Sequence, residues 1–376
     1  MGIGRFVYTP ILPLMTSQAG LSPAAAGALA TANYVGYLVG ALLGVAAPRH
    51  VRTTATWRLS LVTVVAGLAV MPLTHDVAAW LIIRAVTGCA SAMLFVIAVD
   101  WMLDHARGRS AQLPGWGFGG VGTGIALSGL MVLALPHAGW RTAWWTSAVL
   151  AVGVAAIAWN MRGARDQAAA PIPEQAGQRR WFLVVLLCYF LEGVGYIIAG
   201  TFLVAAVGQS SVGWLGSGAW VVVGLAAVPS AALWAMVGAR WSRSTLLAVA
   251  LVGQSIGIAL PAIVGGTAPA LIGAVAFGGT FIGVSTLALA AGRELAVPGA
   301  VAVLTAGYSV GQIVGPLLVT PLLHHGDHGF RHALLASAAI VAGSAATAVW
   351  LRLGCRELRP ASRGADRRRE AIHPAR

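Results

Sequence analysis

The sequence predicts an all-α integral membrane protein whose twelve transmembrane helices form two pseudo-symmetric bundles of six. Three observations support this fold class. First, 58% of the 376 residues are hydrophobic and only 9% are charged, whereas roughly 25% are charged in a typical soluble domain. Second, apolar runs of about 20 residues, the length that spans a bilayer, recur along the whole chain. Third, the second half of the chain repeats features of the first.

Each predicted span is an apolar run bounded by polar, Gly- or Pro-containing connections. Helices are expected because the backbone must satisfy its own hydrogen bonds in lipid, and no run shows the period-2 alternation of a barrel strand. The spans cover residues 1–17, 23–47, 58–73, 78–101, 114–135, 141–161, 181–207, 213–238, 244–264, 268–291, 299–323 and 331–352.

The first span is short. Gly2 to Met15 rises only about 21 Å, against a hydrocarbon core of roughly 30 Å. We therefore expect the sequence to lack the natural beginning of this helix.

Arginine distribution predicts the orientation. The net charge is +13 and all 24 basic residues are Arg. Alternate connections place most of them on one side: Arg49, Arg52, Arg58, Arg107, Arg109, Arg162, Arg165, Arg179, Arg180, Arg240, Arg243, Arg293 and the tail. The opposite side holds Arg141 and Arg331. Since basic loops stay in the cytoplasm, both termini are expected there, in a bacterial inner membrane. This explains the charge better than nucleic-acid binding does.

A polar, Pro- and Ala-rich stretch near the middle divides the chain. The predicted organisation is an N-terminal six-helix bundle at 1–161, a cytoplasmic linker at 162–180, a C-terminal bundle at 181–353 and a basic cytoplasmic tail at 354–376. The tail is expected to lie against anionic lipid head groups or to be disordered.

An internal repeat relates the two halves. With a shift of about 190 residues, GWRTAW at 139–144 falls on GFRHAL at 329–334, and GIG at 2–4 falls on GVG at 193–195. A six-plus-six repeat is typical of secondary transporters, whose substrate site lies near the midplane where the halves meet.

Several longer motifs are distinctive: GIGRFVYTPILPLM at 2–15, ANYVGYLVGALLG at 32–44, GVGTGIALSG at 120–129, YFLEGVGYIIAGTFLVA at 189–205 and FGGTFIGVSTLALAAGRE at 277–294. They resemble the major facilitator superfamily, and more narrowly its bacterial YbfB/YjiJ-type branch. The resemblance implies two six-helix bundles and alternating access, but no substrate. One departure concerns the loop after the second helix: GVAAPRHVR lacks the Asp that usually follows the first Gly, which puts a superfamily-type gate there in doubt.

Ionisable residues at membrane depth are costly and are functional candidates. Arg5 and Glu192 both fall near the midplane, and the repeat aligns Arg5 with Tyr196, one helical turn from Glu192. Glu192 is interpreted as a proton carrier, since burial favours the protonated carboxyl and a nearby cation the ionised one. The alternative is a fixed structural ion pair between Arg5 and Glu192.

A third such residue is Arg84, which opens RAVTGCASA and has Ala274 as its repeat mate. Its guanidinium suits a carboxylate or phosphate, so it is predicted as an anion clamp or proton-relay partner; the alternative is an Arg that caps carbonyls or reaches the interface. Two cations against one acid slightly favour an anionic or zwitterionic substrate. Candidate cavity residues, which as single residues could equally be packing, are Asn33, Tyr34, Tyr37, Trp116, Tyr196, Thr201, Trp220, Tyr308 and Gln312.

A cytoplasmic gate is predicted from two sets of repeat mates. Arg49 or Arg52 would pair with Asp104, and Arg240 or Arg243 with Glu294, latching the outward-facing state. The alternative is that these Arg residues only enforce topology, because exposed ion pairs contribute little.

No enzyme, cofactor or metal site is predicted. The sequence shows no Ser/His/Asp set and no HExxH, and the His-rich segment from His324 to His332 is interpreted as a hydrated loop. The predicted function is a monomeric secondary transporter of a small organic solute, coupled to protons and surrounded by lipid. Alternatives are proton-driven efflux of lipophilic cations and a solute sensor without flux.

Overall fold

The computed structural model describes residues 2–106, 113–135, 139–161, 178–210, 214–238, 240–295, 297, 300–323 and 328–354, with a few side chains inside the helices left undescribed. Throughout these ranges the secondary structure is helical, with turns and no strand. The predicted all-α fold is confirmed. The helices are α1 (Gly2–Phe6), α2 (Tyr8–Gln18), α3 (Pro23–Ala46), α4 (Pro48–Val51), α5 (Thr54–Val70), α6 (Val77–Ala106), α7 (Leu113–Ala134), α8 (Trp140–Ala158), α9 (Gln178–Ser210), α10 (Leu215–Val237), α11 (Arg243–Ile263), α12 (Thr267–Glu294), α13 (Ala300–Leu323) and α14 (Gly329–Gly354).

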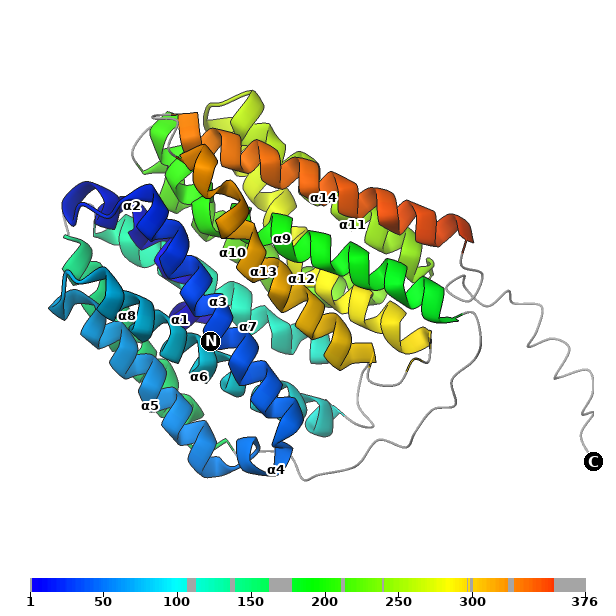
Figure 1. The fold of residues 1–376 in the computed structure, drawn as a ribbon, viewed down its shortest axis with the longest axis horizontal. Helices are drawn as coiled ribbons and strands as arrows, with labels where there is room; N and C mark the ends of the chain where they lie inside the picture. The colour runs from blue at the N-terminus through cyan, green and yellow to red at the C-terminus, as the bar shows by residue number, and fades with distance from the viewer. Residues whose placement is uncertain are drawn as a thin grey trace, which may run out of the picture.

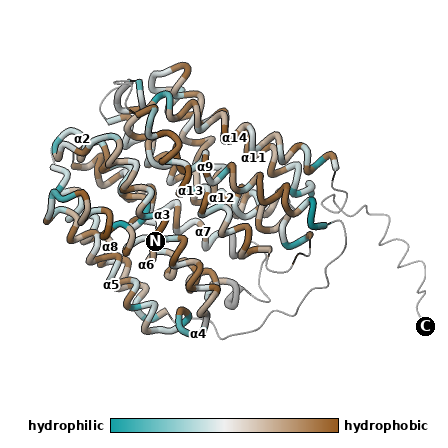
Figure 2. Tube along the Cα trace, viewed as in Figure 1, coloured by the Kyte–Doolittle hydropathy of each residue, from teal (hydrophilic) through white to brown (hydrophobic). Residues whose placement is uncertain are grey.

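Within the described ranges, eleven helices are long and apolar enough to span a membrane, and α1 with α2 forms a twelfth, shorter segment. The break in that segment follows from Pro10, which has no N–H to donate to the Phe6 carbonyl one turn earlier. Figure 2 shows apolar residues along the helices and hydrophilic ones mainly near their ends.

Several long helices start at a side-chain cap. Ser22 accepts a hydrogen bond from the Ala25 N–H at the start of α3, and Thr53 and Ser242 cap α5 and α11 in the same way. Asp76 accepts from two backbone N–H groups in the first turn of α6. These caps satisfy N–H groups that have no partner within the helix.

The helices divide into two halves that Figure 1 shows as two groups. In the N-terminal half α6 packs on α3 and α5; in the C-terminal half α9 packs on α14 and α11 on α12 and α14. The halves meet where α7 contacts α10 and α3 contacts α13. Glycines permit the closest approaches: a Cβ on Gly122 would lie 2.7 Å from the Gly224 carbonyl oxygen, and one on Gly36 would overlap the Ala85 carbonyl. Of the predicted linker only 178–180 is described, and of the tail only Gly354.

The repeat is visible in which residues are buried. Each buried position of α5 has a buried mate on α11 after a shift of 190 residues, although α11 buries further residues: Trp57, Ser60, Leu61, Val64 and Leu68 match Leu247, Ala250, Leu251, Gln254 and Ile258. Helices α8 and α14 agree in the same way from Ala143 and Ala333 as far as Ala151 and Val341. The two halves therefore share a packing pattern as well as sequence motifs.

Candidate functional site

Arg5 lies at the end of α1, buried between the two halves. Its Nη2 donates to Oε1 of Gln312 on α13 over 2.7 Å, and its guanidinium carbon lies 4.2 Å from the Tyr37 ring centre and 5.2 Å from that of Tyr34. Its Nε has no hydrogen-bond partner, and among the described residues no carboxylate pairs with it. A cation without a counter-ion thus spans the contact between halves.

Glu192 lies in the middle of α9 and is fully buried. Its Oε1 accepts a hydrogen bond from Nε2 of Gln254 on α11 over 3.2 Å, whereas its Oε2 has no partner. The Tyr308 side chain faces the same carboxyl. Arg5 and Glu192 therefore do not form the fixed ion pair of the alternative interpretation, because Gln312 and the Tyr rings surround the cation while Gln254 and Tyr308 surround the acid.

Arg84 is buried on α6, with 2% of its surface exposed. Its guanidinium carbon lies 4.9 Å from the Tyr8 ring centre, its Nε has no hydrogen-bond partner, and its backbone carbonyl accepts from Asn33 Nδ2 over 3.0 Å. It lies near enough to Arg5 for the two charges to repel each other. A buried side chain stacked on a ring does not reach the membrane interface, whereas the anion clamp, the proton relay and the carbonyl cap stay predictions.

A row of nearly parallel aromatic rings lines the C-terminal side of this site. Tyr308 stacks on Tyr189 with ring centres 4.3 Å apart, and Tyr196 stacks on Tyr308 at 5.9 Å and on Phe281 at 5.2 Å. Such rings offer flat apolar faces with a polar edge. Tyr189, Glu192 and Tyr196 follow one another at helical spacing on α9, which places the acid beside the row.

The other predicted cavity residues behave differently from one another. Tyr34 lies with its hydroxyl 3.5 Å from that of Thr201, and Trp220 donates to Ser128 across the α7–α10 contact. These contacts join the two halves. Trp116 is half exposed near the start of α7 and lies outside this buried group.

Of the predicted gate pairs, one is seen: Arg243 Nε donates to Glu294 Oε1, between the start of α11 and the end of α12. Both helices belong to the C-terminal half, so the pair does not itself tie the halves together. The side chain of Asp104 lies outside the described residues, and Arg49 is exposed.

Sequence reasoning missed several residues of this site. Gln254, Tyr8, Tyr189, Phe277 and Phe281 were not singled out, although Gln254 interrupts the apolar run ALVGQSIGIAL. A lone amide in the middle of a membrane helix commonly hydrogen-bonds to a neighbouring helix, and that signal could have identified it.

Comparison with known proteins places the fold. Residues 1–349 match the family described as the uncharacterised MFS-type transporter YbfB, where MFS denotes the major facilitator superfamily. The chain belongs to this family of membrane transporters. No curated protein matches it.

Solved structures agree on the architecture of this YbfB-type transporter. A point mutant of the nucleoside transporter NupG superposes with a TM-score of 0.70 over 93% of this chain and 97% of its own, at 12% identity. A second NupG structure, without that mutation, gives 0.65 over 93% and 98%, at 13% identity. These likenesses show the major facilitator fold. The family match makes the chain a transporter rather than an enzyme.

Proposed function

We propose that this YbfB-type protein is a secondary active transporter that moves a small organic solute by alternating access and couples the movement to protons. The observation that carries the proposal is Glu192, a fully buried carboxyl whose Oε2 has no partner and whose neighbours include no cation among the described residues. A carboxyl in such surroundings favours its protonated form, and contact with water on one side of the membrane favours ionisation. Alternate exposure would therefore load and release a proton.

Arg5 and Arg84 support an anionic or zwitterionic substrate. Both guanidinium groups are buried without a carboxylate partner among the described residues, and each leaves its Nε unbonded. A substrate carboxylate or phosphate would supply the missing acceptor, which guanidinium binds bidentately. Arg5 currently donates to Gln312 on the opposite half. Binding an anion in place of Gln312 would couple substrate to the contact between halves.

The aromatic row favours a substrate with a flat portion. Tyr196 and Tyr308 offer ring faces beside both the acid and Arg5, and a planar group gains from offset stacking on such faces. The structural neighbour NupG is named as a nucleoside transporter; nucleosides, which also carry a flat ring, belong in any ligand panel.

One observation supports a second candidate, efflux of lipophilic cations. Glu192 lies beside the rings of Tyr189 and Tyr308, and a carboxylate flanked by aromatic faces also suits an organic cation. In this alternative Glu192 contacts the substrate, and Arg5 and Arg84 have structural roles only.

A thermal-unfolding screen of the purified protein separates these functions. Organic anions, zwitterions, nucleosides and lipophilic cations are tested at two pH values, because a ligand present at about 100 times its Kd stabilises the folded state by about 2.7 kcal/mol. Stabilisation by anions that Arg84→Ala abolishes supports the anion carrier. Stabilisation by lipophilic cations alone, lost in Glu192→Gln, supports the exporter. Stabilisation without flux in proteoliposomes indicates a sensor.

For orientation, we propose that the side carrying α4 with the exposed Arg49, and the start of α11 with Arg243, faces the cytoplasm of a bacterial inner membrane. The excess of Arg on that side supports this placement. Labelling of His50→Cys and His75→Cys by an impermeant thiol reagent in whole cells tests it. Only His75→Cys, on the opposite side, should react.

A further inference from the structure

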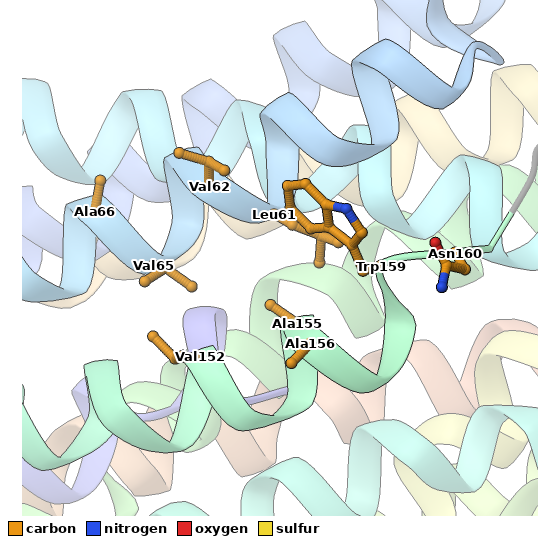
Figure 3. A pocket seen from close by; sticks show the side chains of 9 residues that line it. All are labelled: Leu61, Val62, Val65, Ala66, Val152, Ala155, Ala156, Trp159 and Asn160. Carbon is orange, nitrogen blue, oxygen red and sulfur yellow. The ribbon is translucent and has the colours of Figure 1, made fainter.

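A groove opens on the outer surface of the N-terminal half, between α5 and α8 (Figure 3). Its volume is about 550 Å³, and its walls are aliphatic side chains of both helices, with Trp159 and Asn160 at one end. Val62 and Val152 on these walls are at least half exposed. Because both helices face outward in a membrane bundle, lipid is the medium that meets this groove.

The two halves differ at this place, because α8 packs less closely on α5 than its repeat mate α14 does on α11. On α14 the buried face continues from Val341 through Ala345 and Ala348 to Leu351. On α8 the equivalent face stops at Ala151, and Ala155 is only partly buried. On α14 this later part of the face lies against the first turns of α9, where Trp181 meets Trp350.

Two polar contacts join α5 to the end of α8 on the arginine-rich side. Trp57 Nε1 donates to the Ala158 carbonyl over 2.8 Å, and Arg58 Nε lies 3.4 Å from the Trp159 carbonyl. The Arg58 guanidinium carbon also lies 5.2 Å from the Trp159 ring centre. Within the described residues the two terminal nitrogens of Arg58 have no hydrogen-bond or ion-pair partner. A cation with free donors thus lies beside the mouth of an apolar groove.

The dimensions match one leaflet of a bilayer. The α5 wall from Arg58 to Ala66 rises about 12 Å at 1.5 Å per residue, and half of the hydrocarbon core is about 15 Å. Trp and Arg at one end of a span are typical of the head-group level. The groove therefore runs from the head groups toward the bilayer centre.

We propose that this groove binds one acyl chain of an anionic phospholipid, whose phosphate contacts Arg58 and Asn160. The apolar walls accept the chain, and the unpaired guanidinium nitrogens of Arg58 supply the charge complement for the phosphate. The site takes its lipid from the leaflet on the arginine-rich side. It is separate from the solute site, because its lining residues lie on the outer face of α5 and α8 whereas Arg5, Arg84 and Glu192 are buried.

Native mass spectrometry of the full-length protein, delipidated in detergent, tests this site. The probes are phosphatidylglycerol and phosphatidylethanolamine with identical acyl chains, so that only the head-group charge differs. We expect the wild type to retain one phosphatidylglycerol with about five- to tenfold preference, the effect of one basic side chain at an anionic surface. Arg58→Gln should remove that preference, and Ala156→Phe, which fills the groove, should weaken binding of both lipids.

Two matched variants serve as controls. Arg49→Gln removes an exposed Arg on the same side, and Ala346→Phe adds the same ring at the repeat mate of Ala156; both should bind lipid as the wild type does. Equal retention of the two lipids by the wild type would overturn the proposal, as would unchanged binding in Arg58→Gln and Ala156→Phe. A dimer mass that Ala156→Phe abolishes would assign the groove to a second copy and also overturn it.

Discussion

The two halves of this transporter share a packing pattern but not a chemistry. Each buried position of α5 has a buried mate on α11 after a shift of 190 residues, yet the repeat mates of Arg5 and Arg84 are Tyr196 and Ala274. Among the described residues the N-terminal half carries the buried cations, and the C-terminal half carries the buried acid with its aromatic row. The two halves thus share the positions of buried residues on these helices, whereas they differ in which buried residues are charged.

This difference suggests that the two halves have different functional roles. In our account the N-terminal half binds the substrate anion through Arg5 and Arg84, and the C-terminal half carries the proton on Glu192. Gln254 illustrates the specialisation: it hydrogen-bonds Glu192, while its mate Val64 in the other half packs near Gly4.

The largest expected effect comes from Arg5→Gln. The variant removes the buried cation of the N-terminal half, and we expect it to weaken binding of a stabilising anion by about 100-fold, equal to ~2.7 kcal/mol. The repeat-mate variant Tyr196→Phe keeps the ring face and should change affinity less than about threefold, because it removes no charge. Titration calorimetry with the anion found in the thermal screen measures both. An equal loss of anion affinity in Arg5→Gln and Tyr196→Phe would contradict the assignment of anion binding to the N-terminal half.

Gly36→Ala tests the close contact between α3 and α6. A Cβ there would overlap the Ala85 carbonyl, and such overpacking typically costs about 1–3 kcal/mol of stability. The control Gly153→Ala, on the exposed face of α8, has no atom within 4 Å of the added Cβ and should leave the unfolding temperature within about 2 °C of wild type. A wild-type unfolding temperature for Gly36→Ala would contradict the described packing.

Gln254→Val makes α11 resemble its repeat mate α5 at this position. The variant removes the amide that donates to Glu192 Oε1, and Oε2 already has no partner. We therefore expect the unfolding free energy to fall by about 1 kcal/mol. Val252→Ile, at an exposed position of the same helix, is the control and should change stability less. Chemical denaturation in detergent measures the two, and a stabilised Gln254→Val would show that the amide does not support the acid.

The smallest expected effect belongs to the Arg243–Glu294 pair. Both side chains are at least a third exposed, so Arg243→Gln should change stability by about 0–1 kcal/mol. If the pair also latches the C-terminal half in one state, the transport rate should change while stability does not. Unchanged flux would leave Arg243 with a topological role only.

The sequence predicted the helices and the repeat because both are periodic patterns. It predicted the three buried ionisable residues because a charge inside a membrane carries a high free-energy cost. A charge in a run such as YFLEGVGYIIAG stands out against lipid. Partners could not be predicted in the same way: the Gln312 and Gln254 side chains reach Arg5 and Glu192 from helices that are distant in sequence. The sequence placed Arg5 and Glu192 at a similar depth but could not predict which side chains lie between them. That depends on how each helix is rotated about its axis, which packing between neighbouring helices decides. The groove between α5 and α8 depends on how closely two helices pack, which composition does not show.

The most direct test of the central claim is transport by Glu192→Gln in proteoliposomes. The protein is reconstituted with the anion found in the thermal screen, and two modes are measured: exchange of internal for external anion, and uphill uptake driven by an imposed pH gradient. Our account predicts that exchange continues while gradient-driven uptake is lost, because the C-terminal half no longer carries a proton. Undiminished gradient-driven uptake in Glu192→Gln would contradict it.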